Sequence, residues 1–117
     1  GTFAPVTRAG TTAAFPREGA AKAIDNSRVI EWDYVWIPGR PVAPRIYERD
    51  AVEVFFDGGT IRYRTPDGKE EMHTFARKDA RFVPRGTIRS EEAVAGAPRA
   101  VASCGCLLPR TGSLAKH

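Results

Sequence analysis

The sequence predicts an all-β protein, an antiparallel β-sandwich or jelly-roll barrel. Short segments with alternating apolar residues recur from residue 28 onward, and Gly, Pro and Asp turn signals separate them at regular intervals. Almost no stretch shows the 3.6-residue period of a helix. The 117 residues suit one domain, and a content of 42% hydrophobic and 27% charged residues is ordinary for a globular protein.

The chain divides into three parts. Residues 1–27 mix Thr, Ala, Gly and Pro without a clear period, so we expect an irregular N-terminal arm in which 20–24 form at most one helical turn. Residues 28–104 form the predicted barrel, and 105–117 form a C-terminal tail interrupted by Gly and Pro. The two cysteines lie in or next to this tail, one residue apart, and match no usual zinc pattern.

Alternation defines the predicted strands. In residues 28–36 it places Ile30, Trp32, Tyr34 and Trp36 on one face, which is either core or a dimer surface. Residues 51–56 form a second strand, which the glycines at 58 and 59 turn into a third strand, and an Asp-Gly pair then makes a hairpin. The strands expected from this point are 60–65, 70–77, 80–83, 87–94 and 99–104.

The charge pattern argues against two classes of partner. The net charge is +4 and the pI is about 9.4, but Lys and Arg are scattered without a basic block, so we expect no nucleic-acid binding. Apolar runs are far shorter than the roughly 18 residues of a membrane span. We expect a bacterial-type soluble protein, cytoplasmic or, because the chain begins at Gly1 without Met, periplasmic after loss of an export signal.

The order of turns resembles that of small single-domain cupins over residues 28–102. Gly39 and Gly58 or Gly59 match the frame of the first cupin motif, and the Pro-x-Gly turn of the second motif matches residues 84–86. The resemblance implies a jelly-roll barrel with a small-molecule site in its interior. In typical members that site holds a metal, bound by histidines and a carboxylate.

The metal ligands of the family are replaced in this chain. Arg45 and Tyr47 stand at the two histidine positions of the first motif, Arg89 stands at that of the second, and Glu53 lies one place out of frame. Arg has no lone pair to donate to a metal, and two arginines repel a cation. With only two histidines in the chain, one of them the last residue, we expect no metal and no other cofactor.

The substitution predicts an anion site instead. If the resemblance holds, Arg45, Tyr47 and Arg89 converge inside the barrel, and Trp36 lines the same space. Guanidinium groups beside a phenol suit a carboxylate, phosphate or sulfate. The alternative is that these arginines pair with internal carboxylates, because buried Arg must be paired. Without such pairing, the two acidic residues 91 and 92 are interpreted as solvated charges, and His73 is interpreted as a surface residue.

Three functions therefore remain open. The first is a metal-free, non-catalytic barrel that binds a small anionic molecule. The second is an enzyme of cupin type, an isomerase, lyase or oxygenase, which the loss of metal ligands disfavours. The third is a structural module that dimerises through its aromatic strand face; we expect a homodimer.

Overall fold

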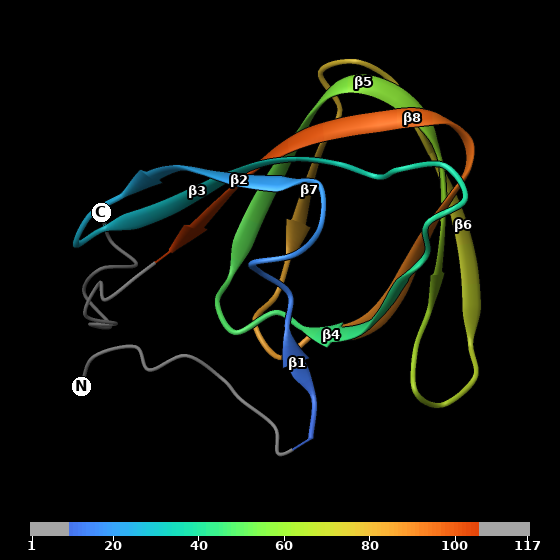
Figure 1. Cartoon of the computed structure of the whole chain (residues 1–117), viewed down its shortest axis with the longest axis horizontal. Coiled ribbons are helices and arrows are strands. Elements are labelled where there is room, and N and C mark those ends of the chain that lie inside the picture. The colour runs from blue at the N-terminus through green and yellow to red at the C-terminus, as the bar shows by residue number, and fades with distance from the viewer. Residues whose placement is uncertain (1–9, 106–117) are drawn as a thin grey trace.

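The computed structural model describes residues 10–105, and this part of the chain is all β (Figure 1). The predicted C-terminal tail lies outside the described residues, except for Gly105. No helix with the length and apolarity of a membrane span occurs within the described range. The strands are β1 (Thr12–Ala13), β2 (Ala20–Asp25), β3 (Val29–Val35), β4 (Val42–Ile46), β5 (Ala51–Arg64), β6 (Glu70–Phe75), β7 (Ala80–Val83) and β8 (Ile88–Gly105).

Two long bent strands form the frame of the fold. β5 and β8 pair antiparallel along almost their whole lengths, from Ala51 opposite Cys104 to Arg64 opposite Ser90. One half of this pair is extended by β3, β2 and β7, and the other half by β4, β1 and β6. The single sheet therefore curls into two half-sheets that face each other, which confirms the predicted jelly-roll class (Figure 1).

The bends lie at glycines that the sequence analysis assigned to turns. Gly59 pairs with Gly96, and both remain inside continuous strands. A Cβ atom on Gly59 would lie 2.5 Å from the carbonyl oxygen of Ala95, so only glycine permits this approach of the two strands. The predicted breaks at 57–59 and 96–98 are therefore wrong: these residues bend the strands without ending them.

From residue 10 onward, the N-terminal arm is more ordered than predicted. Residues 20–25 form β2, which pairs with β3 through a bulge, and not a helical turn. Most of its side chains are exposed, so as an edge strand it lacks the alternation that would have revealed it. Upstream of it, Ala14 and Arg17 are buried against the barrel.

Aromatic rings fill the core between the half-sheets. Tyr34 and Trp36 are each 1% exposed, so the aromatic face of β3 is core and not a dimer surface. The Trp36 ring stacks on Phe55 at 5.6 Å between centroids, and Phe55 stacks on Phe75 at 4.0 Å. This aromatic stack connects the residue that follows β3 with β5 and β6.

Candidate functional site

Two glutamates lie in the middle of the core. Glu53 on β5 is fully buried and Glu91 on β8 is 1% exposed, and they come from opposite half-sheets. Both point inward, because each is buried between two less buried neighbours that lie on the opposite face of its strand. The interpretation of Glu91 as a solvated charge is therefore wrong. A buried carboxylate requires charge or hydrogen-bond partners, and the two glutamates differ in what they receive.

Glu91 is fully satisfied. Its Oε1 accepts hydrogen bonds from Arg17 Nη2 at 3.0 Å and Trp36 Nε1 at 2.8 Å, and its Oε2 accepts from Tyr47 Oη at 2.8 Å and Arg89 Nε at 2.9 Å. Burial opposes ionisation of Glu91, but the charges of Arg17 and Arg89 outweigh it and lower its pKa to about 2. Glu91 is an anion at neutral pH.

Glu53 is only half satisfied. Its Oε2 accepts a hydrogen bond from the Tyr34 hydroxyl, whereas its Oε1 has no hydrogen-bond partner and lies 3.8 Å from Arg89 Nη2. Burial, followed by the negative charge of Glu91, raises the pKa of Glu53 above its ordinary value. The core thus holds one carboxylate that stays ionised and a second with a raised pKa.

Arg17 reaches this centre from the N-terminal segment. Its guanidinium lies over the rings of Phe15, Tyr34 and Trp36, at 5.0, 4.9 and 5.5 Å from their centroids. Cation–π contact and the ion pair with Glu91 together hold this buried charge. The sequence analysis missed Arg17, because nothing in an irregular, Thr- and Ala-rich segment indicates that one residue enters a core.

Three of the four predicted site residues converge as expected. Trp36, Tyr47 and Arg89 all donate to Glu91, and the Arg89 guanidinium lies 5.2 Å from the Tyr47 ring centroid. The point where the sequence predicted a bound anion is therefore occupied by Glu91 of the chain itself. For Arg89 the alternative of internal pairing is the one that the structure shows.

Arg45 has a different role. Its Nη1 donates to the carbonyl oxygens of Ala13 at 2.8 Å and Pro16 at 3.3 Å. It opposes Arg89 in the register of β4 and β8, but its hydrogen bonds run to the N-terminal segment and not to the carboxylates. Arg45 therefore fixes the segment that carries Arg17, and it does not join the predicted donor set at Glu91.

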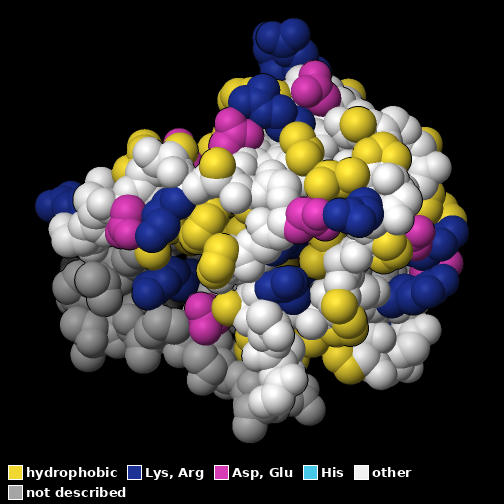
Figure 2. Space-filling model, in the orientation of Figure 1, with side chains coloured by type: hydrophobic (Ala, Val, Ile, Leu, Met, Phe, Trp, Pro, Cys, Tyr) yellow, Lys and Arg dark blue, Asp and Glu magenta, His cyan; other side chains and the backbone are white. Residues whose placement is uncertain are grey.

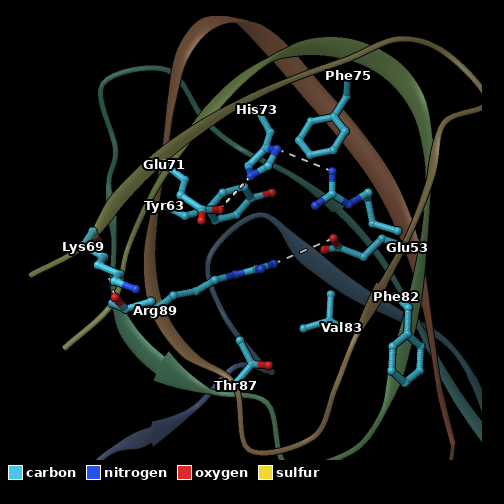
Figure 3. Close-up of a pocket in the computed structure, with 12 residues that line it drawn as sticks. Glu53, Tyr63, Lys69, Glu71, His73, Phe75, Phe82, Val83, Thr87 and Arg89 are labelled. Carbon is cyan, nitrogen blue, oxygen red and sulfur yellow. Dashed lines mark hydrogen bonds and ion pairs between the residues drawn. The ribbon is translucent and has the colours of Figure 1, made fainter. Parts of the chain in front are cut away.

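A pocket opens above Glu53 and Arg89, at the mouth of the barrel (Figure 3). It has a volume of about 170 Å³ and lies among β5, β6, β7 and the start of β8. Glu53 and Arg89 form its floor, and aromatic side chains form part of its wall. The lining residues are Glu53, Tyr63, Thr65, Lys69, Glu71, His73, Phe75, Arg81, Phe82, Val83, Thr87 and Arg89.

The pocket wall is built from contacts between neighbouring strands. The Arg89 guanidinium lies 4.1 Å from the centroid of the Tyr63 ring, and that ring is tilted against His73 at 5.7 Å. His73 Nε2 lies 2.9 Å from Glu71 Oε1, and His73 Nδ1 lies 3.4 Å from Arg81 Nη1 (Figure 3). His73 was interpreted as a surface residue; its side chain is 30% exposed, and it lines the pocket.

These residues do not fit the metal that the cupin resemblance implies. Guanidinium groups of Arg17 and Arg89 lie against the Glu91 carboxylate, where they would repel a divalent cation. In the part of the chain from 10 to 105, no group of three or more His, Cys, Asp or Glu side chains comes together in a way that could hold a metal ion. The donor set suits anions and carbonyl oxygens.

Comparison with solved structures identifies the fold. A cupin domain from Bordetella pertussis Tohama I superposes with a TM-score of 0.64 at 20% identity, over 82% of this chain and 100% of that chain. An RmlC-like cupin family protein with a double-stranded β-helix fold, from Methanocaldococcus jannaschii, gives a TM-score of 0.62 at 11% identity, over 86% and 94%.

A third similar structure is that of an enzyme. The polyketide cyclase RemF from Streptomyces resistomycificus gives a TM-score of 0.58 at 23% identity, over 89% of this chain and 80% of that chain. The scan against protein-family models and the search of curated proteins found no match. With the curled eight-stranded sheet of its described residues, the chain has the fold of these cupin structures.

Proposed function

We propose that this cupin-like barrel binds a small organic anion, and that the anion lies in the pocket above Glu53 and Arg89. The sequence prediction of an anionic ligand is kept, but its position moves outward, because Glu91 occupies the interior point. Arg89 remains the central donor. The observation that carries the proposal is that Arg89 Nη2 is buried without a hydrogen-bond partner while Arg89 lines the pocket.

The chemistry of the wall supports an anionic ligand. The pocket is lined by three cationic side chains, Lys69, Arg81 and Arg89, and by two acidic ones, of which Glu71 is paired with His73. Arg89 Nε is held by Glu91, which fixes the plane of the guanidinium and aims Nη2 without a further cost in side-chain entropy. An oxygen of the ligand would complete the hydrogen bonding of Nη2.

The size of the pocket limits the ligand. About 170 Å³ is below the roughly 300–1,000 Å³ of sites for drug-sized molecules. A carboxylic acid of a few carbon atoms fits, with its apolar part against Tyr63 and Phe75. On the face that Figure 2 shows, basic and acidic side chains lie interspersed.

Titration with 2-oxobutanoate, followed by NMR of the labelled protein, tests the proposal. We expect saturable shifts of the amides around His73 and Arg89, and their loss in Arg89→Lys, which keeps the charge but not the planar fork. Arg81→Ala removes a second cationic side chain of the same pocket, and because Arg81 is exposed, the substitution leaves the core unchanged. Arg64→Ala is the matched control, because Arg64 is exposed and does not line the pocket. Unsaturable shifts, or equal binding in all variants, would contradict the proposal.

We also propose that the chain forms a homodimer, through a surface other than the one predicted. Val52, Phe56 and Phe82 are 44%, 43% and 61% exposed, and Val52 pairs directly with Phe82 across β5 and β7. Large apolar side chains that are adjacent and exposed are typical of protein contacts. This outer face replaces the aromatic face of β3, which is buried.

A further inference from the structure

We propose that Glu53 is a general acid–base residue, and that the barrel catalyses proton transfer at a carbon atom next to a carbonyl group of the bound molecule. This inference rests on the proposed binding of a small organic anion in the same pocket. It replaces the expectation of a non-catalytic barrel with a specific reaction class. The substrate class is that of small carboxylates with a ketone and an acidic C–H bond.

The geometry of Glu53 suits a base. Oε2 is fixed by the Tyr34 hydroxyl, so the carboxyl group has a defined orientation. Oε1 is buried, carries no hydrogen bond and belongs to a residue of the pocket floor (Figure 3). A buried oxygen that makes no hydrogen bond and meets its cationic partner Arg89 only at 3.8 Å calls for an explanation, and exchange of a proton with a ligand supplies one.

Arg89 supplies the complementary group. Its Nη2 makes no hydrogen bond and forms a long ion pair with Glu53 Oε1 at 3.8 Å, a spacing that places a carbonyl oxygen on Nη2 while the adjacent carbon lies near Oε1. The negative charge that develops on the carbonyl oxygen would then meet a fixed cationic donor in a water-poor site. Glu91 cannot act as the base, because four hydrogen bonds occupy its oxygens.

The proton transfer balances without a co-reactant. The C–H bond breaks and its proton goes to Glu53 Oε1. The electron pair of that bond forms a C=C bond, and the carbonyl π pair moves onto oxygen to give an enolate, which accepts a hydrogen bond from Arg89 Nη2. Return of the proton to the same carbon exchanges hydrogen with solvent, and return to another atom of the enolate gives an isomer; neither outcome changes the oxidation state.

The protonation state of Glu53 supports this role. Burial and the charge of Glu91 raise the pKa of Glu53 above its ordinary value, which makes its carboxylate a stronger base than a solvent-exposed one. A raised pKa also means that the fold opposes ionisation of Glu53, so Glu53→Gln, which removes that charge, should fold. The ionisable groups around Glu53 are Arg17, Tyr34, Tyr47, Tyr63, Arg81, Arg89 and Glu91.

Hydrogen exchange at C3 of 2-oxobutanoate in D₂O, followed by proton NMR, tests the inference. We expect the wild-type protein to accelerate the exchange above the buffer rate, and Glu53→Gln to lose about 10²–10⁴-fold of that acceleration. Glu92→Gln is the matched control, because it removes the same charge from a partly exposed position outside the pocket. Circular dichroism checks that each variant is folded.

The outcomes separate the two proposals. Binding of 2-oxobutanoate without accelerated exchange overturns the catalytic role of Glu53 and leaves the binding proposal intact, whereas failure of both overturns both. Equal exchange in wild type and Glu53→Gln also overturns the role of Glu53. Independently of any variant, the exchange rate of the wild type should rise through a pKa above 4.5, and a rise at or below 4.5 would contradict the assignment.

Discussion

At the scale of single residues, the two buried glutamates show how the environment sets the function of a side chain. Glu91 receives two guanidinium groups and two neutral donors, whereas Glu53 receives one phenol and a distant guanidinium. The pKa of Glu91 is therefore lowered and that of Glu53 raised, although the two side chains are chemically identical. Glu91 is suited to hold the site together, and Glu53 to react.

Glu91→Gln should destabilise the protein in a pH-dependent way. The variant leaves Arg17 and Arg89 without their counter-charge, and breaking such a buried pair costs about 3–5 kcal/mol. Because the folded pKa of Glu91 is about 2, below the ordinary glutamate value of 4.5, its contribution is fully present above pH 4.5 and is lost as the pH falls towards 2.

Urea unfolding at several pH values measures this effect. The stability difference between wild type and Glu91→Gln should be largest at pH 6–7 and should shrink below about pH 4.5. Glu92→Gln serves again as the control, since a partly exposed pair such as Arg62–Glu92 contributes at most about 1 kcal/mol. A difference between wild type and Glu91→Gln that does not vary with pH would contradict the assigned ionisation.

At the scale of strands, a glycine can mark either the end of a strand or a bend within it, and the sequence does not distinguish the two. Glycines at 58, 59 and 96 were interpreted as ends of strands, but they mark the bends at which β5 and β8 cross closely. Both situations require a residue without Cβ, so composition alone cannot distinguish them. The hairpin of β5 and β6 and the short strand β7 were predicted correctly, because local turn and strand signals specify them.

The alternation of side chains along β5 did not determine which of its two faces is buried. It shows that Val52 and Val54 share a face, but not which face of β5 points inward. The structure turns Ala51, Glu53 and Phe55 into the core, and a glutamate at the centre of that face contradicts the usual rule of burial. The barrel and the convergence of Trp36, Tyr47 and Arg89 were predictable, whereas the inward position of Glu53 and the burial of Arg17 depend on contacts between distant segments.

Gly59→Ala should destabilise the barrel. The added Cβ would lie 2.5 Å from the carbonyl oxygen of Ala95 and 2.7 Å from Pro98 Cγ, so the two bent strands would have to separate. Overpacking of this kind costs about 1–3 kcal/mol. Gly105→Ala is the control, because a Cβ there meets no atom within 4 Å. Equal urea midpoints for the two variants would contradict the role of Gly59 in the bend.

At the scale of the whole molecule, one barrel presents two different surfaces. The concave inner face carries the charged cluster and the pocket, whereas the outer face of β5 and β7 exposes apolar residues. A homodimer formed through this outer face would cover Val52 and Phe56. Phe82 belongs to both regions, because it pairs with Val52 on this outer face and also lines the pocket.

Val52→Lys should therefore shift the protein from dimer to monomer. A lysine in the centre of an apolar contact must lose water without a partner, which disfavours association. Light scattering over a range of protein concentrations gives the mass. Met72→Lys is the matched control, since Met72 is 53% exposed on β6, away from β7. A wild-type protein that remains a monomer at all concentrations would contradict the proposed homodimer.

The N-terminal segment has a further consequence for the reactivity of the pocket. Arg17 contributes a positive charge that lowers the pKa of Glu53, although the two residues belong to segments far apart in the chain. Displacement of this segment would withdraw that charge and move the titration of Glu53 to higher pH. The segment between β1 and β2 thus adjusts the basicity of a carboxylate on β5, although burial and the charge of Glu91 have larger effects, and this adjustment requires no movement of the pocket itself.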